Sequence, residues 1–251
     1  MTATLFVIPG SHPCWTARLA LDNAGVDYRR IDLLPVVSRG VLTAAGFPTV
    51  TVPAMVVDGE RVQGSREICH FLDHTRPTLT LLPEDLERRT RIEEIERWGD
   101  EVLQPIPRRL SWWCLTKDIE PLRSYTDDAR LGIPIGLAVR MAPPVAWASK
   151  KLNKASDMAV RADLAALPNL IDRVDEWIRD GLLGGADEPN AADLQIAPTL
   201  RLLQTFEDIR PHIDGRPTGD LARRLLPEYP GHMPAVLPAD WLEPLRAGID
   251  A

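Results

Sequence analysis

The stretch LFVIPGSHPC, residues 5–14, joins an apolar run typical of a buried β-strand to a segment with helical spacing. The Pro-Gly pair in its middle is typical of a chain reversal, so Ser11 to Cys14 should lie at a strand-to-helix turn. Free backbone N–H groups and the helix dipole stabilise a thiolate or another anion at a helix N-terminus. The turn is therefore a candidate site for chemistry, with Ser11 and Cys14 as its candidate catalytic residues.

The same residues also allow a purely structural interpretation. Ser11 and Cys14 have the spacing of a Cys-x-x-Cys redox pair in which Ser takes the first place. However, Ser11 can serve only as a helix N-cap, Pro13 as a first-turn proline and Cys14 as a small buried residue. These residues alone leave both interpretations open.

Length, charge and cysteine content limit the classes of function. A chain of 251 residues is long enough for one large domain or two modest ones. A formal net charge of −7 without a dense Lys/Arg run argues against nucleic-acid binding and favours small or weakly charged partners. Cys14, Cys69 and Cys114 are too few for a disulfide framework and lack metal-ligand spacing, so we expect no metal. We see no secretion signal and expect a cytoplasmic protein.

Residues 26–34 resemble a second strand, and the order strand, helix, strand predicts a parallel pair. One short helix is expected over residues 38–45. A β-branched run at 49–57 contains Pro53, which marks either the first residue of an edge strand or a cis-proline turn. A cis-proline turn would leave the Val52 N–H and C=O free to bind an extended peptide.

The run then ends at Asp58-Gly59, which predicts a hairpin turn, and Gly64-Ser65 opens a one-faced helix. Ser65 is the expected N-cap of that helix. A Ser hydroxyl and free N–H groups at a helix start can hold a carboxylate, although such a Ser is also often a simple cap.

Together these motifs resemble the thioredoxin-fold half of a glutathione S-transferase. The matching features are the active-site turn, Arg-Leu-Ala-Leu, Thr-Val-Pro-Ala, the Asp-Gly hairpin and Gly-Ser-Arg-Glu-Ile, which begin at Ser11, Arg18, Thr51, Asp58 and Gly64. The resemblance is close over residues 4–73 and looser over 84–205. It implies an α/β thioredoxin-like domain at residues 1–76, a linker, and an all-α helical-bundle domain at residues 84–251 with a proline-rich tail.

The resemblance also assigns roles. Register with Arg18 places Ser11 at the catalytic position of zeta-like Ser and omega-like Cys members, and Cys14 in the second place of a glutaredoxin-like pair. The family's cis-proline matches Pro53, and the backbone of Val52 would bind the cysteinyl part of glutathione.

The remaining part of the thiol site matches with one departure. Ser65 falls on the family's Ser that binds the γ-glutamyl carboxylate. The residue before it is usually acidic or Gln, and here it is Gly64. The implied cosubstrate is therefore glutathione or another low-molecular-weight thiol.

In the second half, residues 86–103 follow helical spacing until Pro105 and Pro107 kink or end the helix. In the family the next segment lines the electrophile pocket, which makes Arg109, Trp112 and Trp113 the candidates. Adjacent helical residues point in different directions, so at most one of the two tryptophans should line the pocket.

Two further segments stand out. Residues 131–148 are apolar, but Arg140 and three prolines interrupt them, whereas a membrane span needs about 20 mainly apolar residues. We expect a lid or extra helix there, with a segment lying on a membrane surface as the alternative. Asn190 and Asp193 predict a capping box at the start of a buried helix, as in the family.

The leading functional hypothesis is a transferase in which a bound thiol, ionised at the turn, attacks or isomerises a small apolar electrophile. Ser11 would donate a hydrogen bond to the thiolate. The alternatives are a thiol-disulfide oxidoreductase that uses Cys14, and a non-catalytic binding or scaffold protein. We expect a homodimer with no integral membrane segment.

Overall fold

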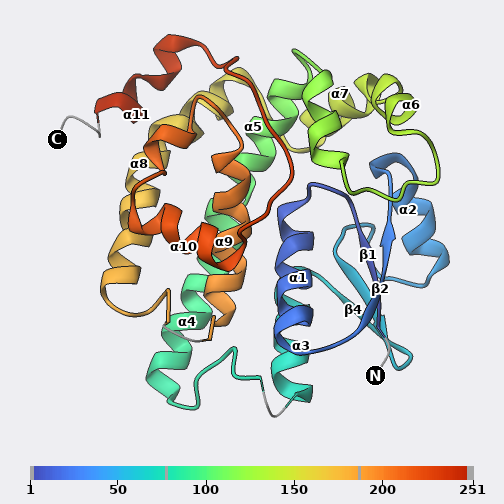
Figure 1. Ribbon diagram of the computed structural model, residues 1–251, viewed down its shortest axis with the longest axis vertical. Helices are drawn as coiled ribbons and strands as arrows, with labels where there is room; N and C mark the ends of the chain where they lie inside the picture. Colours follow the sequence, from blue (N-terminus) through green and yellow to red (C-terminus); the bar gives the residue numbers. More distant parts are fainter. Residues whose placement is uncertain (1–2, 77–78, 186–187, 248–251) are drawn as a thin grey trace.

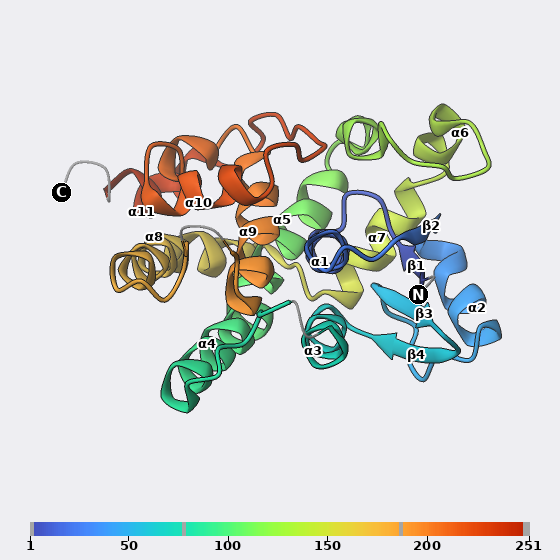
Figure 2. The ribbon, with the colours of Figure 1, turned by 60° about the horizontal axis from the view of Figure 1, so that its bottom comes forward.

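The structure, a computed structural model, describes residues 3–76, 79–185 and 188–247. Its first part is a mixed sheet in the order β2-β1-β3-β4, in which β1 is parallel to β2 and the other pairs are antiparallel. The helices α1 and α3 cover one face of the sheet and α2 lies on the other (Figures 1 and 2). The elements are β1 (Ala3–Val7), α1 (His12–Asn23), β2 (Tyr28–Asp32), α2 (Pro35–Ala44), β3 (Ala54–Val57), β4 (Glu60–Gln63) and α3 (Ser65–Thr75).

This arrangement confirms the predicted thioredoxin-like fold, the parallel β1–β2 pair and the cis peptide bond before Pro53. The hairpin is confirmed too, because Asp58 and Gly59 have φ of 48° and 90° between β3 and β4. The predicted strand at 49–57 is shorter in the structure, since Pro53 has no N–H to donate to a strand ladder.

The expected N-cap of α3 is wrong. Gly64, with φ of 113°, holds the N-cap position, and Ser65 is the first helical residue. Glycine adopts this backbone conformation without strain, which allows the chain to reverse between β4 and α3.

The rest of the described chain is helical, as predicted. Its α-helices are α4 (Leu86–Trp98), α5 (Pro105–Leu115), α6 (Ile135–Arg140), α7 (Pro143–Leu152), α8 (Asp157–Arg179), α9 (Ala191–Gln204), α10 (Pro217–Leu225) and α11 (Glu243–Ala247). A π-helix, η1 (Gly99–Leu103), precedes α5, and there are 3₁₀ helices at η2 (Glu120–Thr126), η3 (Arg210–His212) and η4 (Ala239–Leu242). The predicted break before Pro105 is confirmed at η1. The predicted domain boundary falls partly on residues 77 and 78, which lie outside the described residues.

The apolar stretch at 131–148 forms the two short helices α6 and α7. No helix in the described ranges has the length and apolar character needed to cross a membrane.

Helix α9 is the centre of the helical part. All its residues except Arg201 are buried, and it packs against α1, α4 and α10. The predicted capping box is confirmed, because Asn190 accepts from the Asp193 N–H and Asp193 accepts from the Asn190 N–H.

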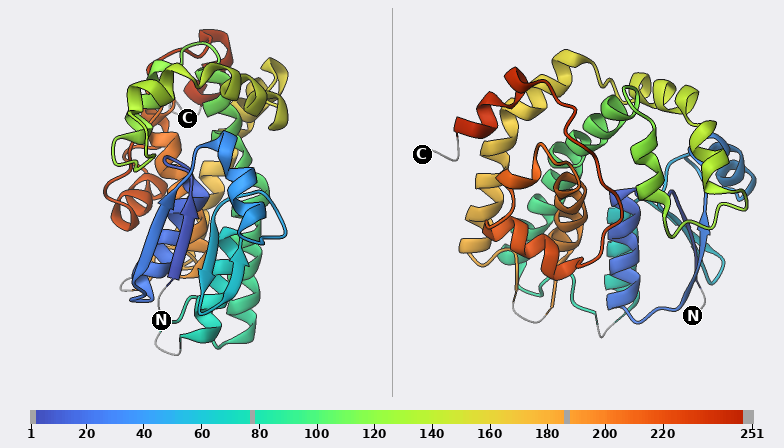
Figure 3. Two further views of the ribbon diagram at one scale, coloured as in Figure 1. Left: turned by 90° about the vertical axis from the view of Figure 1, so that its right-hand side faces the viewer. Right: turned by 45° about the horizontal axis from the view of Figure 1, so that its top comes forward.

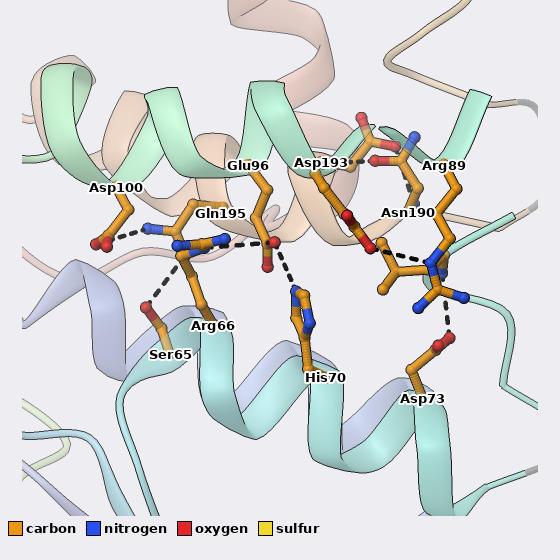
Figure 4. A network of polar contacts seen from close by, with 12 residues as sticks. Ser65, Arg66, His70, Asp73, Arg89, Glu96, Asp100, Asn190, Asp193 and Gln195 are labelled. Atoms are coloured by element: carbon orange, nitrogen blue, oxygen red, sulfur yellow. Dashed lines mark hydrogen bonds and ion pairs between the residues drawn. The ribbon is translucent and has the colours of Figure 1, made fainter. Parts of the chain in front are cut away.

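Polar contacts join α3 to the helical part (Figure 4). The Ser65 hydroxyl donates to Oε1 of Gln195 on α9 over 3.1 Å. Glu96 of α4, which is fully buried, accepts from His70 over 2.7 Å and lies 3.4 Å from Arg66. The start of α3 is thereby held against α4 and α9.

The His70–Glu96 contact predicts a pH dependence of stability. The hydrogen bond that His70 donates to Glu96 raises the pKa of His70 above its usual value. A raised histidine pKa stabilises the fold fully below the unfolded value, near 6.5, and this stabilisation is lost as pH rises through the folded pKa. His70 is more than one-third exposed, so we expect a loss below about 1 kcal/mol.

Urea denaturation at about pH 5.5 and about pH 8.5 measures this effect. We expect His70→Gln to remove the part of the dependence that His70 contributes, because Gln retains a donor for Glu96 but does not titrate. The lowered pKa values of His12 and His212 contribute a dependence of opposite sign in both proteins, so the comparison of wild type with variant is the measurement. His74→Gln, on the exposed side of the same helix, should leave the pH dependence unchanged. An identical pH dependence in wild type and His70→Gln would contradict the assignment.

Candidate functional site

Three segments meet at one edge of the sheet. Ala54 of β3 pairs with Phe6 of β1 in antiparallel register, so the start of β3 lies beside the end of β1. Ala54 also pairs with Gln63 at the end of β4, and the Gly64 N–H donates to the Pro53 C=O over 3.0 Å. The topology therefore brings the β1–α1 turn, the cis-proline and the start of α3 to the same edge.

Ser11 occupies the N-cap position of α1, but its side chain makes no capping hydrogen bond. Its C=O accepts from the N–H groups of Cys14 and Trp15, at 3.0 and 3.2 Å, and its hydroxyl is hydrogen-bonded to the Cys14 side chain. The half-buried hydroxyl is therefore not used for capping and lies at the positive end of the helix dipole.

Cys14 is only 2% exposed. Burial raises the pKa of its thiol to about 11, although the Ser11 hydrogen bond and the charges of Arg18 and Arg108 act in the opposite direction. About one thiol in 10⁴ is ionised at neutral pH with such a pKa. Cys14 is therefore a poor nucleophile in this state.

His12, within the turn, and Arg108 of α5 determine the electrostatics on the buried side of the turn. The His12 ring is buried, and its Nε2 lies 3.2 Å from the Gln104 C=O, to which it donates. Burial, followed by the charge of Arg108, lowers the pKa of His12 well below its usual value, so the ring is neutral. Arg108 is half-buried, and its charge acts on both His12 and Cys14. Arg18 and Arg108 are thus the cations that act on the turn.

Val52 precedes the cis peptide bond to Pro53. No hydrogen bond within the described part of the chain uses the Val52 N–H or C=O. This edge of backbone can therefore pair with an extended peptide-like ligand.

The start of α3 combines a free helix N-terminus with a carboxylate. Ser65 is buried and donates its hydroxyl to Gln195, so its N–H and its hydroxyl oxygen are the groups that remain for a ligand. A Cβ atom added to Gly64 would lie 1.9 Å from Oε2 of Glu67. The Glu67 carboxylate therefore occupies the space that a side chain at position 64 would take.

The predicted electrophile-pocket residues lie on α5, and their side chains have different partners. Arg109 forms a bidentate ion pair with Asp163 on α8, in which its Nε and Nη2 donate to the two carboxylate oxygens over 2.6 Å each. Trp113 is buried, and its Nε1 donates to Asp157 over 2.8 Å, whereas Trp112 is half-buried. The structure does not bring Arg109 or Trp113 to the turn, and Arg108 is the arginine of α5 that acts there.

Two later segments cover the turn. The tail segment, residues 226–237, runs past the N-terminal end of α1 (Figure 1 and Figure 3, right). Tyr229 donates its hydroxyl to the Gly10 C=O over 2.8 Å, and its ring lies 5.6 Å from that of Trp15 between centroids.

The second covering segment is the insert, residues 116–156, between α5 and α8. Its Asp128 pairs with Arg30 at 2.6 Å, and the Arg130 N–H donates to Asp32 over 2.7 Å. A cavity of about 10 Å³, room for roughly one water, remains beside Cys14 and Trp15. No group of three or more His, Cys, Asp or Glu in the described residues is arranged to hold a metal ion.

Comparisons with known proteins agree with this geometry. Residues 5–80 match the family model described as glutathione S-transferase, N-terminal domain. A probable maleylacetoacetate isomerase of Caenorhabditis elegans is 33% identical over 94 residues, which cover 37% of this chain and 44% of that protein. The rat maleylacetoacetate isomerase is 30% identical over 96 residues, with the same coverage. The chain thus spans less than half the length of the curated relatives it matches.

Solved structures are similar over nearly the whole chain. A glutathione S-transferase of Sinorhizobium meliloti has a TM-score of 0.57 and 19% identity, covering 97% of this chain and 99% of that one. A maleylacetoacetate isomerase of Anaeromyxobacter dehalogenans, with GSH bound in its active site, has a TM-score of 0.50 and 20% identity, covering 98% and 94%. At these identities the similarity shows the fold.

Proposed function

Since this chain is glutathione S-transferase-like, with a glutathione S-transferase N-terminal domain at residues 5–80 and the fold of that family throughout, we propose that it binds glutathione or a related small thiol. It then adds the thiol to a small apolar electrophile, or isomerises the electrophile by reversible addition. The observation that carries this proposal is the meeting, at one edge of the sheet, of the Ser11 hydroxyl that is not used for capping, the free Val52 backbone and the start of α3.

The chemistry requires a thiolate at neutral pH. The Ser11 hydroxyl, the dipole of α1 and the charges of Arg18 and Arg108 each stabilise negative charge at the turn. The ionised sulfur adds to an electron-poor carbon, and Ser11 keeps its hydrogen bond to sulfur while the negative charge moves onto the electrophile. For isomerisation, the new C–S bond makes the former double bond single, rotation follows, and loss of the thiolate restores the double bond.

Names of similar proteins support the isomerase form of this proposal. The relatives that match the N-terminal part are maleylacetoacetate isomerases, and a structural neighbour of that name holds GSH in its active site. The redox alternative has less support, because the buried Cys14 thiol has a raised pKa. A homodimeric, cytoplasmic protein is part of the same proposal, and light scattering of the purified protein tests the dimer.

Ligand-dependent stability tests the thiol site. Glutathione present at about 100 times its dissociation constant should stabilise the fold by about 2.7 kcal/mol. Glutathione analogues of similar charge that lack the sulfur atom should stabilise it less. The readout is the melting temperature against glutathione concentration, with other low-molecular-weight thiols in parallel. If none of the thiols raises the melting temperature, the proposal is wrong and the scaffold alternative is favoured.

Within this proposal Glu67 replaces the acidic residue that is absent at position 64. Its carboxylate lies where a side chain of residue 64 would lie, and no hydrogen bond or ion pair within the described chain uses it. An α-amino group next to a carboxylate bound at Ser65 would meet this negative charge. Glu67 would therefore bind the γ-glutamyl amino group of glutathione.

We expect Glu67→Gln to weaken glutathione binding about tenfold, the scale of one lost charge-assisted hydrogen bond. Glu87→Gln, an exposed glutamate in the first turn of α4, is the matched control. A glutathione analogue without the amino group should bind wild type and Glu67→Gln equally. A tenfold difference that persists with this analogue would show that Glu67 acts in some other way.

A further inference from the structure

Three arginines from different elements converge on one groove of the helical part. The groove has a volume of about 360 Å³ and is lined by Arg201 of α9, Arg210 of η3 and Arg223 of α10, together with residues of the tail segment. Asp214 is the only carboxylate among its described lining residues. The groove is thus locally cationic in a chain whose formal net charge is −7.

The chain itself neutralises little of this charge. Asp214 binds Arg223 over 2.9 Å and also accepts from Gln204 over 3.1 Å. Arg201 donates to the C=O groups of Leu226 and Pro227 and to Gln204, with no direct carboxylate contact. Within the described residues, the Arg210 guanidinium makes no hydrogen bond or ion pair.

The lowered pKa of Arg201 agrees with an incompletely neutralised positive charge in the groove. Burial lowers the pKa of Arg201, the neighbouring Arg223 lowers it further, and Asp214 opposes the change. Like charges held in one half-buried groove repel each other, and a bound anion relieves that repulsion. The guanidinium group matches the planar oxygens of carboxylate and phosphate groups, with two parallel hydrogen bonds to each.

We propose that this groove binds a small polyanion bearing phosphate or carboxylate groups, with Arg210 as a direct ligand and Arg201 and Arg223 as its cationic wall. The site is separate from the thiol site, since none of Ser11, Val52 or Ser65 lines it. Tyr229 lines the groove and also donates to the Gly10 C=O. The bound anion would therefore lie one side chain away from the β1–α1 turn.

Calorimetric titration with inorganic phosphate and, separately, with citrate tests the proposal, with sodium chloride holding the ionic strength constant. We expect saturable binding of at least one anion, weakened about tenfold or more by Arg210→Gln, since a charge-assisted hydrogen bond is lost. Arg161→Gln removes an equal charge from an exposed position on α8 and should leave the affinity unchanged. Tighter phosphate binding would point to a phosphorylated ligand, and tighter citrate binding to a polycarboxylate.

Two results would overturn the proposal: no saturable binding of either anion, or equal weakening by Arg210→Gln and Arg161→Gln. Glutathione-induced stabilisation, measured in parallel, should be the same in Arg210→Gln as in wild type. This second readout separates failure of the anion site from failure of the thiol site, and it shows that the variant is folded.

Discussion

Ser11→Ala is expected to lower kcat/KM for thiol addition or isomerisation at neutral pH by about 10²-fold, because loss of the hydrogen bond raises the pKa of the bound thiol and each unit of pKa above the assay pH lowers the ionised fraction about tenfold. The reason is that the Ser11 hydroxyl is not used for capping and lies at the N-terminal end of α1. Ground-state affinity for glutathione should change little, so the loss should appear in kcat. Steady-state kinetics with a chromogenic electrophile measures both parameters.

Cys14→Ser is the matched comparison, because it changes the other candidate in the same turn. We expect less than a fivefold effect, since the buried Cys14 thiol has a pKa of about 11 and is almost entirely protonated at neutral pH. The pH profile adds a second readout: the apparent pKa of the bound thiol should rise in Ser11→Ala and stay unchanged in Cys14→Ser. The reverse pattern, with activity lost only in Cys14→Ser, would favour redox chemistry.

Asp193→Ala should produce the largest loss of stability, about 3 kcal/mol. Its fully buried carboxylate accepts from the N–H groups of Gly184 and Asn190, at 2.8 and 3.1 Å. Removal leaves two buried donors unpaired and the capping box of α9 incomplete, at roughly 1–3 kcal/mol for each unsatisfied group. Urea denaturation measures the difference.

The control for that experiment is Asp220→Ala, which removes an exposed acidic residue from the first turn of α10. A change within about 0.5 kcal/mol is expected for such a surface site. Equal losses in the two variants would mean that the buried hydrogen bonds of Asp193 contribute nothing beyond general charge at a helix start.

Local signals in the sequence were sufficient for much of the fold. The strand-turn-helix at residues 5–14, the Asp58-Gly59 hairpin and the Asn190 capping box depend on residues close in sequence, and all three are present. The residues around Pro53 left a cis-proline turn and an edge-strand proline both open, and the family resemblance favoured the cis bond, which is present. Such features depend on a few neighbouring residues, so they can be predicted from the sequence without knowledge of the tertiary structure.

The misassigned or missed features depend on distant partners. Ser65 looked like an N-cap, but its hydroxyl bonds to Gln195, 130 positions away. The ion pair between Arg109 and Asp163 was missed, because the two residues lie on different helices, and the place of Arg109 in an electrophile pocket stays a prediction. The action of Arg108 on the turn was missed as well, since it depends on how α5 packs against α1. Assignments of these side chains as ligand-binding residues stay predictions.

The contact between Tyr229 and Gly10 joins residues 219 positions apart. During synthesis the β1–α1 turn therefore leaves the ribosome long before the tyrosine that covers it. Because domains generally fold as units during synthesis, the thioredoxin-like half can fold while this turn is still uncovered. The turn therefore reaches its covered form only after Tyr229 has been synthesised and has closed this loop of more than two hundred residues.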